Sequence, residues 1–188
     1  MKLILASASP RRKEILTTNG YNFDVVVSDY EEKETVLSPK KLVEFFALKK
    51  AEQVCDSFLE EGVVVLGADT VVVYKGEVLG KPKSEKDAVK TLKKLSGKTH
   101  KVITGYALIG SEKVFVGSVT SKVKFNKLTD EIINDYVATG SPLDKAGSYG
   151  IQDNFGIVKN YSGSLNNIIG LPIEEIEKHL KKFGIKKD

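Results

Sequence analysis

The sequence has a single cysteine and no long apolar run, and each absence narrows the class of protein. Cys55 is the only cysteine among 188 residues, which excludes a disulfide within the chain and fits a reducing compartment. It shares a helical stripe with Ala51, Val54 and Phe58, so we expect a small core residue and not a nucleophile. No apolar stretch approaches the roughly 20 residues of a membrane span, and the N-terminus shows no signal-peptide pattern. We therefore expect a soluble, cytoplasmic protein with no membrane partner.

Several common catalytic patterns are also missing. The two histidines, His100 and His179, are far apart and have no cysteine or carboxylate at metal-ligand spacing, which argues against a zinc site. No serine lies in a nucleophile elbow, so a hydrolytic triad is not expected. The chain contains neither a Walker A motif nor a dinucleotide fingerprint.

The charge balance is mild, with 29 basic and 25 acidic residues and a net charge of +4. Such an excess does not indicate a nucleic-acid binder, whose basic residues would cluster on one face. The length and the 41% hydrophobic composition suit one globular domain, or one domain in two lobes. Because no repeat, linker or low-complexity segment interrupts the chain, we expect a single continuous domain over residues 1–188.

Arginine is scarce, and both arginines lie in one short stretch near the N-terminus. A predicted buried strand at 3–6 is followed by a polar loop from Ser7 and by a helix that Ser9 would cap, with Pro10 in its first turn. Arg11 and Arg12 come next, and arginine differs from lysine in its planar, bidentate recognition of phosphate or carboxylate. The stretch is therefore either an anion site at a helix N-terminus or an ordinary exposed first turn.

The rest of the chain alternates predicted strands and helices. Apolar runs and turn signals predict strands at 23–27, 63–73, 101–109, 113–125 and near 156–159, with a hairpin at Lys75-Gly76. Cap and periodicity signals predict helices from Ser38, over 84–95, over 128–138 with Thr129 as its cap, and from Pro172 to about Lys182. An acidic connection containing Glu31, Glu32 and Glu34 follows the second strand. The strand at 63–73 has small and polar residues at 67–70, where we expect a break.

Asp69 is the best catalytic candidate. A carboxylate inside a nearly continuous apolar strand is costly to bury unless it is paired, hydrogen-bonded or metal-bound. It could hold a hard divalent cation or activate water. The alternative is a turn-forming aspartate satisfied by nearby N–H groups. Glu32 could add a second metal-binding carboxylate, although charge runs in loops are usually only solvated.

Other candidates are weaker when taken singly. Lys81 lies between Gly80 and Pro82, on a constrained backbone that favours a directed role, though a turn lysine is commoner. The helix pattern alone places Lys50 at the surface, although it could also point into a cleft. Gln152 ends a loop rich in small residues, and its amide could read a base edge through its paired donor and acceptor; an ordinary surface loop is the alternative.

Taken together, four stretches resemble the Maf family of nucleoside triphosphate pyrophosphatases. They are 7–12 with Glu14, 67–72, 80–82 and 141–152, and they occur in the family's order along essentially the whole chain. The resemblance implies an α/β fold with a long, bent mixed sheet flanked by helices, and two lobes with a central cleft. It also implies hydrolysis of a nucleoside triphosphate to the monophosphate and pyrophosphate, with Mg²⁺ or Mn²⁺ as the divalent metal. A homodimer is implied as well.

Within that family, the sequence is most similar to the branch that acts on dTTP and UTP. The resemblance places the proton acceptor at Asp69 and a metal site at Asp69 and Glu32. It implies substrate-specificity roles for Arg12, Thr70 and Gln152. The residues similar to the family's phosphate-contacting set are Ser7, Ser9, Arg11, Lys50 and Lys81.

Two other readings stay open. One is a regulator of cell division or septum formation that binds nucleotide or nucleic acid without turnover, which would tolerate the loss of Asp69. The other is a different phosphohydrolase that uses the same phosphate grip. A binder of phosphates has no need of a carboxylate beside the basic residues unless a metal is present, and this favours the enzyme.

Overall fold

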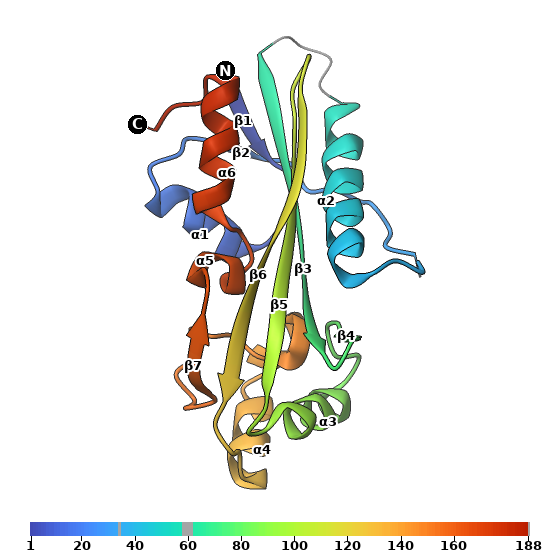
Figure 1. Ribbon diagram of the computed structural model, residues 1–188, viewed down its shortest axis with the longest axis vertical. Helices are drawn as coiled ribbons and strands as arrows, with labels where there is room; N and C mark the ends of the chain where they lie inside the picture. Colours follow the sequence, from blue (N-terminus) through green and yellow to red (C-terminus); the bar gives the residue numbers. More distant parts are fainter. Residues whose placement is uncertain (34, 58–61, 188) are drawn as a thin grey trace. The chain divides into compact units, whose positions relative to one another are not determined.

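A computed structural model of the protein describes residues 1–33, 35–57 and 62–187 (Figure 1). Glu34 of the predicted acidic connection and Phe58 of the predicted helical stripe lie outside the described residues. Within the described part, a seven-stranded sheet has the order β2-β1-β3-β5-β6-β7, and β4 also pairs with β3. β1 runs parallel to β2 and β3, whereas the β3–β4 and β6–β7 pairs are antiparallel. The mixed sheet with flanking helices confirms the predicted fold class.

The secondary structure follows the expected order. The strands are β1 (Lys2–Leu5), β2 (Asp24–Val25), β3 (Val63–Tyr74), β4 (Glu77–Leu79), β5 (Thr99–Ile109), β6 (Val114–Phe125) and β7 (Val158–Ser162). The α-helices are α1 (Pro10–Thr18), α2 (Pro39–Cys55), α3 (Glu85–Leu95), α4 (Asp130–Ala138), α5 (Leu165–Ile169) and α6 (Ile173–Leu180). Short 3₁₀ turns follow at Ser141–Asp144, Ala146–Ser148 and Lys181–Phe183. No helix among these is long and apolar enough to cross a membrane.

The chain divides into two compact units. The first contains residues 1–69, 104–119 and 170–188, and the second contains 70–103 and 120–169. The division agrees with the expected two lobes, whereas the central cleft stays a prediction. The first unit therefore contains Asp69, and the second begins at Thr70, the next residue of β3.

The core of the first unit lies where α2 packs on the sheet. Ile4, Val65 and Ala107 of the strands meet Ala47 and Ala51 of the helix, and all five are buried. Figure 1 shows α2 on one side of these strands, with α1 and α6 on the other.

Two strand glycines let the backbone of α2 approach closely. A Cβ at Gly67 would lie 2.2 Å from the carbonyl oxygen of Ala47, and one at Gly105 would lie 2.3 Å from that of Val43. Any side chain at these positions would push the helix away from the sheet. The two glycines thus fix the height and the register of α2 above β3.

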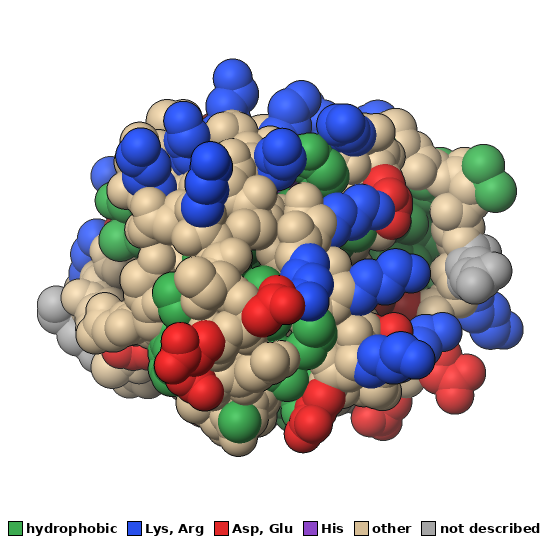
Figure 2. Space-filling view, turned by 90° about the horizontal axis from the view of Figure 1, so that it is seen from below, with side chains coloured by type: hydrophobic (Ala, Val, Ile, Leu, Met, Phe, Trp, Pro, Cys, Tyr) green, Lys and Arg blue, Asp and Glu red, His purple; other side chains and the backbone are tan. Residues whose placement is uncertain are grey.

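The second unit has its own core. It is built from buried side chains of α3, α4 and the neighbouring strands, among them Leu92, Val123, Phe125 and Tyr136. At the surface, side chains of both signs share the face seen in Figure 2, where lysines and arginines in blue occur with acidic residues in red.

Several sequence-based expectations need correction. β3 runs without interruption from Val63 to Tyr74, so the break expected at 67–70 is wrong. The small residues there make room for α2 and do not end the strand. β2 is only two residues long instead of five, and β7 begins at Val158, two residues later than expected.

The helix caps differ from one another. The Thr129 hydroxyl accepts a hydrogen bond from the N–H of Ile132, as expected. The Ser84 hydroxyl, for which no cap was predicted, accepts one from the N–H of Asp87. Ser9 and Ser38 occupy the cap positions but make no side-chain cap bond. In both cases a proline begins the helix, and its fixed φ already suits the first turn.

Candidate active site

Arg12 ties three separate segments of the first unit together. Its Nε donates to the carbonyl oxygen of Gly170 at 2.9 Å. Its Nη1 donates to the carbonyl oxygen of Ala68 at 2.9 Å and to the Ser7 hydroxyl at 3.1 Å. The guanidinium therefore connects α1 to the strand residue just before Asp69 and to the segment that leads into α6. Burial lowers the pKa of Arg12 and Asp69 opposes this, yet an arginine stays protonated in proteins.

The loop before α1 is organised around Ser7. The Ser7 side chain is buried, and its oxygen accepts both from Arg12 and from the N–H of Ser9 at 3.3 Å. The polar stretch predicted from the sequence is therefore a folded turn whose shape depends on the arginine that follows it. It stands at the N-terminus of α1, where the helix dipole favours an anion.

Lys50 joins two carboxylates. Its Nζ lies 2.8 Å from Oδ1 of Asp69 and 2.5 Å from Oε1 of Glu32. The seating of α2 explains the contact, because Lys50 precedes the buried Ala51 while Asp69 is two residues beyond Gly67. The sequence pattern alone placed Lys50 at the surface, and this is wrong, since only 17% of its side chain is exposed.

The environment of Asp69 is strongly polarised. Only 8% of the residue is exposed, and burial is the main reason why the pKa of Asp69 is raised. The Glu32 carboxylate raises the pKa of Asp69 further, whereas Lys50 and Arg12 lower it. The net direction is upward, which makes Asp69 a better proton acceptor than an exposed aspartate would be.

The structure brings most of the predicted site residues into the first unit. Arg12, Ser7 and Ser9 form one hydrogen-bonded group, and Lys50, Asp69 and Glu32 form another. Asp69 directly follows Ala68, whose carbonyl oxygen accepts from Arg12, so the two groups adjoin along β3. Arg11 lies in the first turn of α1, beside Arg12.

Three predicted site residues, Thr70, Lys81 and Gln152, belong to the second unit. There the N–H of Gly147 donates to the carbonyl oxygen of Gly80 at 3.1 Å. A Cβ on Gly147 would lie 2.6 Å from Cγ2 of Val72. Parts of three of the four family-like stretches therefore meet within this unit. They are residues 70–72 of the stretch at 67–72, the turn at 80–82 and the loop at 141–152.

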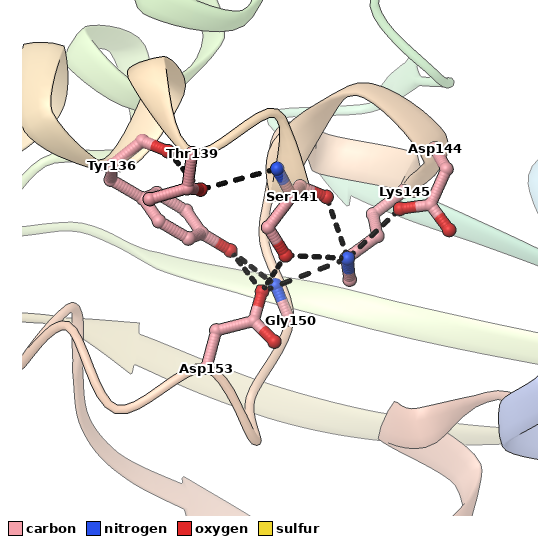
Figure 3. A network of polar contacts seen from close by, with 7 residues as sticks. All are labelled: Tyr136, Thr139, Ser141, Asp144, Lys145, Gly150 and Asp153. Atoms are coloured by element: carbon pink, nitrogen blue, oxygen red, sulfur yellow. Dashed lines mark hydrogen bonds and ion pairs between the residues drawn. The ribbon is translucent and has the colours of Figure 1, made fainter.

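Sequence reasoning missed a polar cluster around the last of these stretches. Figure 3 shows Tyr136 of α4 pointing toward Asp153, with Ser141 and Lys145 close by. The adjacent charges of Asp144 and Lys145, in a loop with two glycines, were visible in the sequence. Nothing in the spacing links Tyr136 to Asp153, because the contact forms only when the loop folds back on α4.

Comparison with known proteins adds to this geometry. The Maf family, described as Maf-like protein, matches residues 2–183. A relative from Bacillus cereus (strain B4264), named dTTP/UTP pyrophosphatase, is 46% identical over 98% of this chain and 96% of its own length. A relative of the same name from Bacillus thuringiensis subsp. konkukian (strain 97-27) is 45% identical with the same coverage. Among solved structures, a nucleoside-triphosphatase, dITP/XTP pyrophosphatase, from Mycobacterium abscessus is 18% identical, with a TM-score of 0.46 over 66% of this chain and 74% of its own.

Proposed function

Since the chain belongs to the Maf family, we propose that it hydrolyses dTTP and UTP to the nucleoside monophosphate and pyrophosphate. Relatives named dTTP/UTP pyrophosphatase, which are 45–46% identical over 98% of the chain, support the substrate class. The observation that carries the chemistry is the shared contact of Lys50 with Asp69 and Glu32. A half-buried ammonium between two carboxylates, next to a helix N-terminus bearing two arginines, suits a phosphate substrate that arrives with a cation.

The donor set fits a divalent metal bound together with substrate. In residues 1–33, 35–57 and 62–187, no group of three or more His, Cys, Asp or Glu side chains could hold a metal ion. Mg²⁺ in nucleotide enzymes commonly uses one or two carboxylates and takes its other ligands from water and phosphate oxygens. Asp69 and Glu32 would hold Mg²⁺ or Mn²⁺ in this way. When bound, the metal supplies neutralisation of the charge on the phosphates.

The chain's own residues then divide the work. A triphosphate carries about four negative charges near neutral pH, and cleavage at the α-phosphorus adds charge to the leaving pyrophosphate, so electrostatic stabilisation carries most of the catalysis. We assign binding of the substrate's phosphates to five residues, which are Ser7, Ser9, Arg11, Lys50 and Lys81. Asp69 accepts a proton from the attacking water.

Base recognition is assigned to Gln152, with Thr70 and Arg12. A pyrimidine that carries a 4-oxo group and an N3–H presents one acceptor and one donor, which a single amide can match. The contacts of Arg12 with Ala68 and Gly170 indicate that it also holds the backbone beside Asp69. The homodimer implied by the resemblance stays a prediction.

The experiment is a screen of purified protein against the canonical nucleoside triphosphates with Mg²⁺ or Mn²⁺. We expect dTTP and UTP to be turned over fastest, with pyrophosphate and monophosphate as products. Asp69→Asn should lower kcat by about 100-fold or more. Asp130→Asn, which changes an exposed partner of Lys93, is the matched control and should leave kcat unchanged.

The outcomes separate the alternatives. Release of orthophosphate with a nucleoside diphosphate would contradict attack at the α-phosphorus and indicate a different phosphohydrolase. Binding of dTTP without any turnover, unaffected by Asp69→Asn, would support the non-catalytic regulator.

A further inference from the structure

A network of polar contacts fixes the loop that carries Gln152. We call Tyr136, Ser141, Lys145 and Asp153, together with the backbone of Gly150, the loop clamp (Figure 3). Oδ2 of Asp153 accepts from the Tyr136 hydroxyl at 2.6 Å and from the Ser141 hydroxyl at 2.8 Å. All of these residues lie within the second unit.

Lys145 is the cation of the loop clamp. Its Nζ donates to the carbonyl oxygen of Ser141 at 2.6 Å, to the Ser141 hydroxyl at 2.9 Å and to Oδ1 of Asp144 at 2.8 Å. It also lies 3.7 Å from Oδ2 of Asp153. Only 11% of the lysine side chain is exposed. A poorly exposed ammonium is stable only when it is well paired, so the loop has a defined conformation around it.

The loop clamp holds the backbone on both sides of Gln152. The Gly150 N–H donates to the Tyr136 hydroxyl at 2.9 Å, and the Asp153 N–H donates to the Gly150 carbonyl oxygen at 3.1 Å. A Cβ on Gly150 would lie 2.7 Å from Oδ2 of Asp153, so the glycine permits this close return. One tyrosine oxygen therefore anchors the residue two before Gln152 and the residue just after it.

The Gln152 side chain, unlike the backbone around it, is not held by the loop clamp. It is exposed, and its side-chain amide makes no hydrogen bond to any residue in the described ranges. A rigid backbone thus carries an amide whose donor and acceptor are both available to a ligand. Such an arrangement suits recognition, because a preorganised group loses less freedom when it binds.

We propose that the loop clamp positions the Gln152 amide for the pyrimidine base, and that Tyr136 and Asp153 are positioning residues for nucleotide discrimination. The proposal rests on the proposed function, in which Gln152 reads the base. It adds residues that do not touch the substrate and act through the placement of one side chain. The effect should appear in the choice between nucleotides and in KM, whereas kcat depends on the proton acceptor Asp69, which no member of the loop clamp contacts.

The test is the ratio of kcat/KM for dTTP to that for dCTP. The cytosine base of dCTP differs from thymine at the 4-position and at N3, and it also lacks the 5-methyl group. Tyr136→Phe keeps the ring, which packs 4.8 Å from that of Phe155, and removes only the oxygen. We expect the ratio to fall about tenfold, mainly through a higher KM for dTTP, with kcat within about twofold of the unaltered protein.

Tyr149→Phe is the matched control. It removes a buried hydroxyl from the same loop, but the hydrogen bond of that hydroxyl is to Nε2 of His100 at 2.8 Å. The ratio should therefore stay unchanged even if thermal stability falls. Asp153→Asn is a second probe should Tyr136→Phe not fold, because it keeps the shape and loses the charge opposite Lys145.

A double-mutant cycle with Gln152→Ala separates base reading by Gln152 from the positioning of Gln152 by the loop clamp. Once Gln152 is gone, Tyr136→Phe should have no further effect on the ratio. If Gln152→Ala itself leaves the ratio unchanged, base reading by Gln152, part of the proposed function, is wrong. If Gln152→Ala lowers the ratio but the clamp variants do not, or if the two effects simply add, the positioning role is overturned.

Discussion

Replacing Arg12 by lysine should destabilise the protein even though the charge is kept. The guanidinium uses two nitrogens to reach three acceptors, the carbonyl oxygens of Gly170 and Ala68 and the hydroxyl of Ser7. A lysine offers a single nitrogen and cannot reproduce the planar fork. At least one of the two carbonyl oxygens therefore loses its charged donor.

The expected size follows from that loss. A hydrogen bond to a charged group contributes about 1.5–3 kcal/mol, so Arg12→Lys should lower the free energy of unfolding by about 2 kcal/mol. That corresponds to a fall of about 30-fold in the ratio of folded to unfolded protein. Arg12→Met, which removes all three contacts, should cost about 4 kcal/mol on the same basis.

Urea denaturation followed by circular dichroism measures the effect, with the m-value checked for each variant. Activity of the same samples should be compared at a temperature where all are folded, so that a stability loss is not mistaken for a catalytic one. If both variants unfold within 0.5 kcal/mol of the unaltered protein, the tie between α1, β3 and the segment before α6 contributes nothing measurable, and the reasoning fails.

Three further predictions concern buried residues. Burial lowers the pKa of His100 from 6.5 to about 4, so the unfolded state binds the extra proton between these values. Stability should fall by up to about 3 kcal/mol as the pH drops through that window, and His100→Gln should flatten the dependence in urea titrations from pH 7 to 4. Ser148 has φ of 61° and a buried hydroxyl without a partner in the described part of the chain. Ser148→Ala should raise the free energy of unfolding by about 1 kcal/mol and so raise the urea midpoint; an unchanged or lower midpoint would count against this. Gly67→Ala should cost about 3 kcal/mol or more and lower kcat, because its Cβ would meet the Ala47 carbonyl oxygen at 2.2 Å; a variant of normal stability and activity would show that α2 can move away freely.

The local elements could be predicted from the sequence because their signals are local. Thr129 and Ser84 mark helix starts through bonds to residues three positions ahead, and Lys75-Gly76 forms its hairpin with positive φ at both residues. The continuity of β3 could not be predicted. In the sequence alone, Gly67 resembles the end of a strand. It is needed because the backbone of α2 packs against it, and that contact depends on a helix that lies elsewhere in the chain.

The candidate residues could be named from the sequence, whereas the contacts among them could not be predicted. A lone carboxylate in an apolar strand draws attention to Asp69 because burial without a partner is costly. Lys50 carries no such signal, since a lysine beside a helical stripe is usually solvated. Its contact with Asp69 depends on the position of α2 along the sheet, which two glycines fix. Tyr136 was missed for a related reason, because its hydroxyl contacts form only through the fold of a distant loop.

The proposed site residues are divided between the two units. Arg12, Glu32, Lys50 and Asp69 fall in the first unit, while Thr70, Lys81 and Gln152 fall in the second. The buried clusters that support them share no residue. If Gln152 reads the base as proposed, substitutions around it that change the choice of base leave the buried cluster of Ile4, Ala47, Ala51 and Val65 in the first unit unaltered.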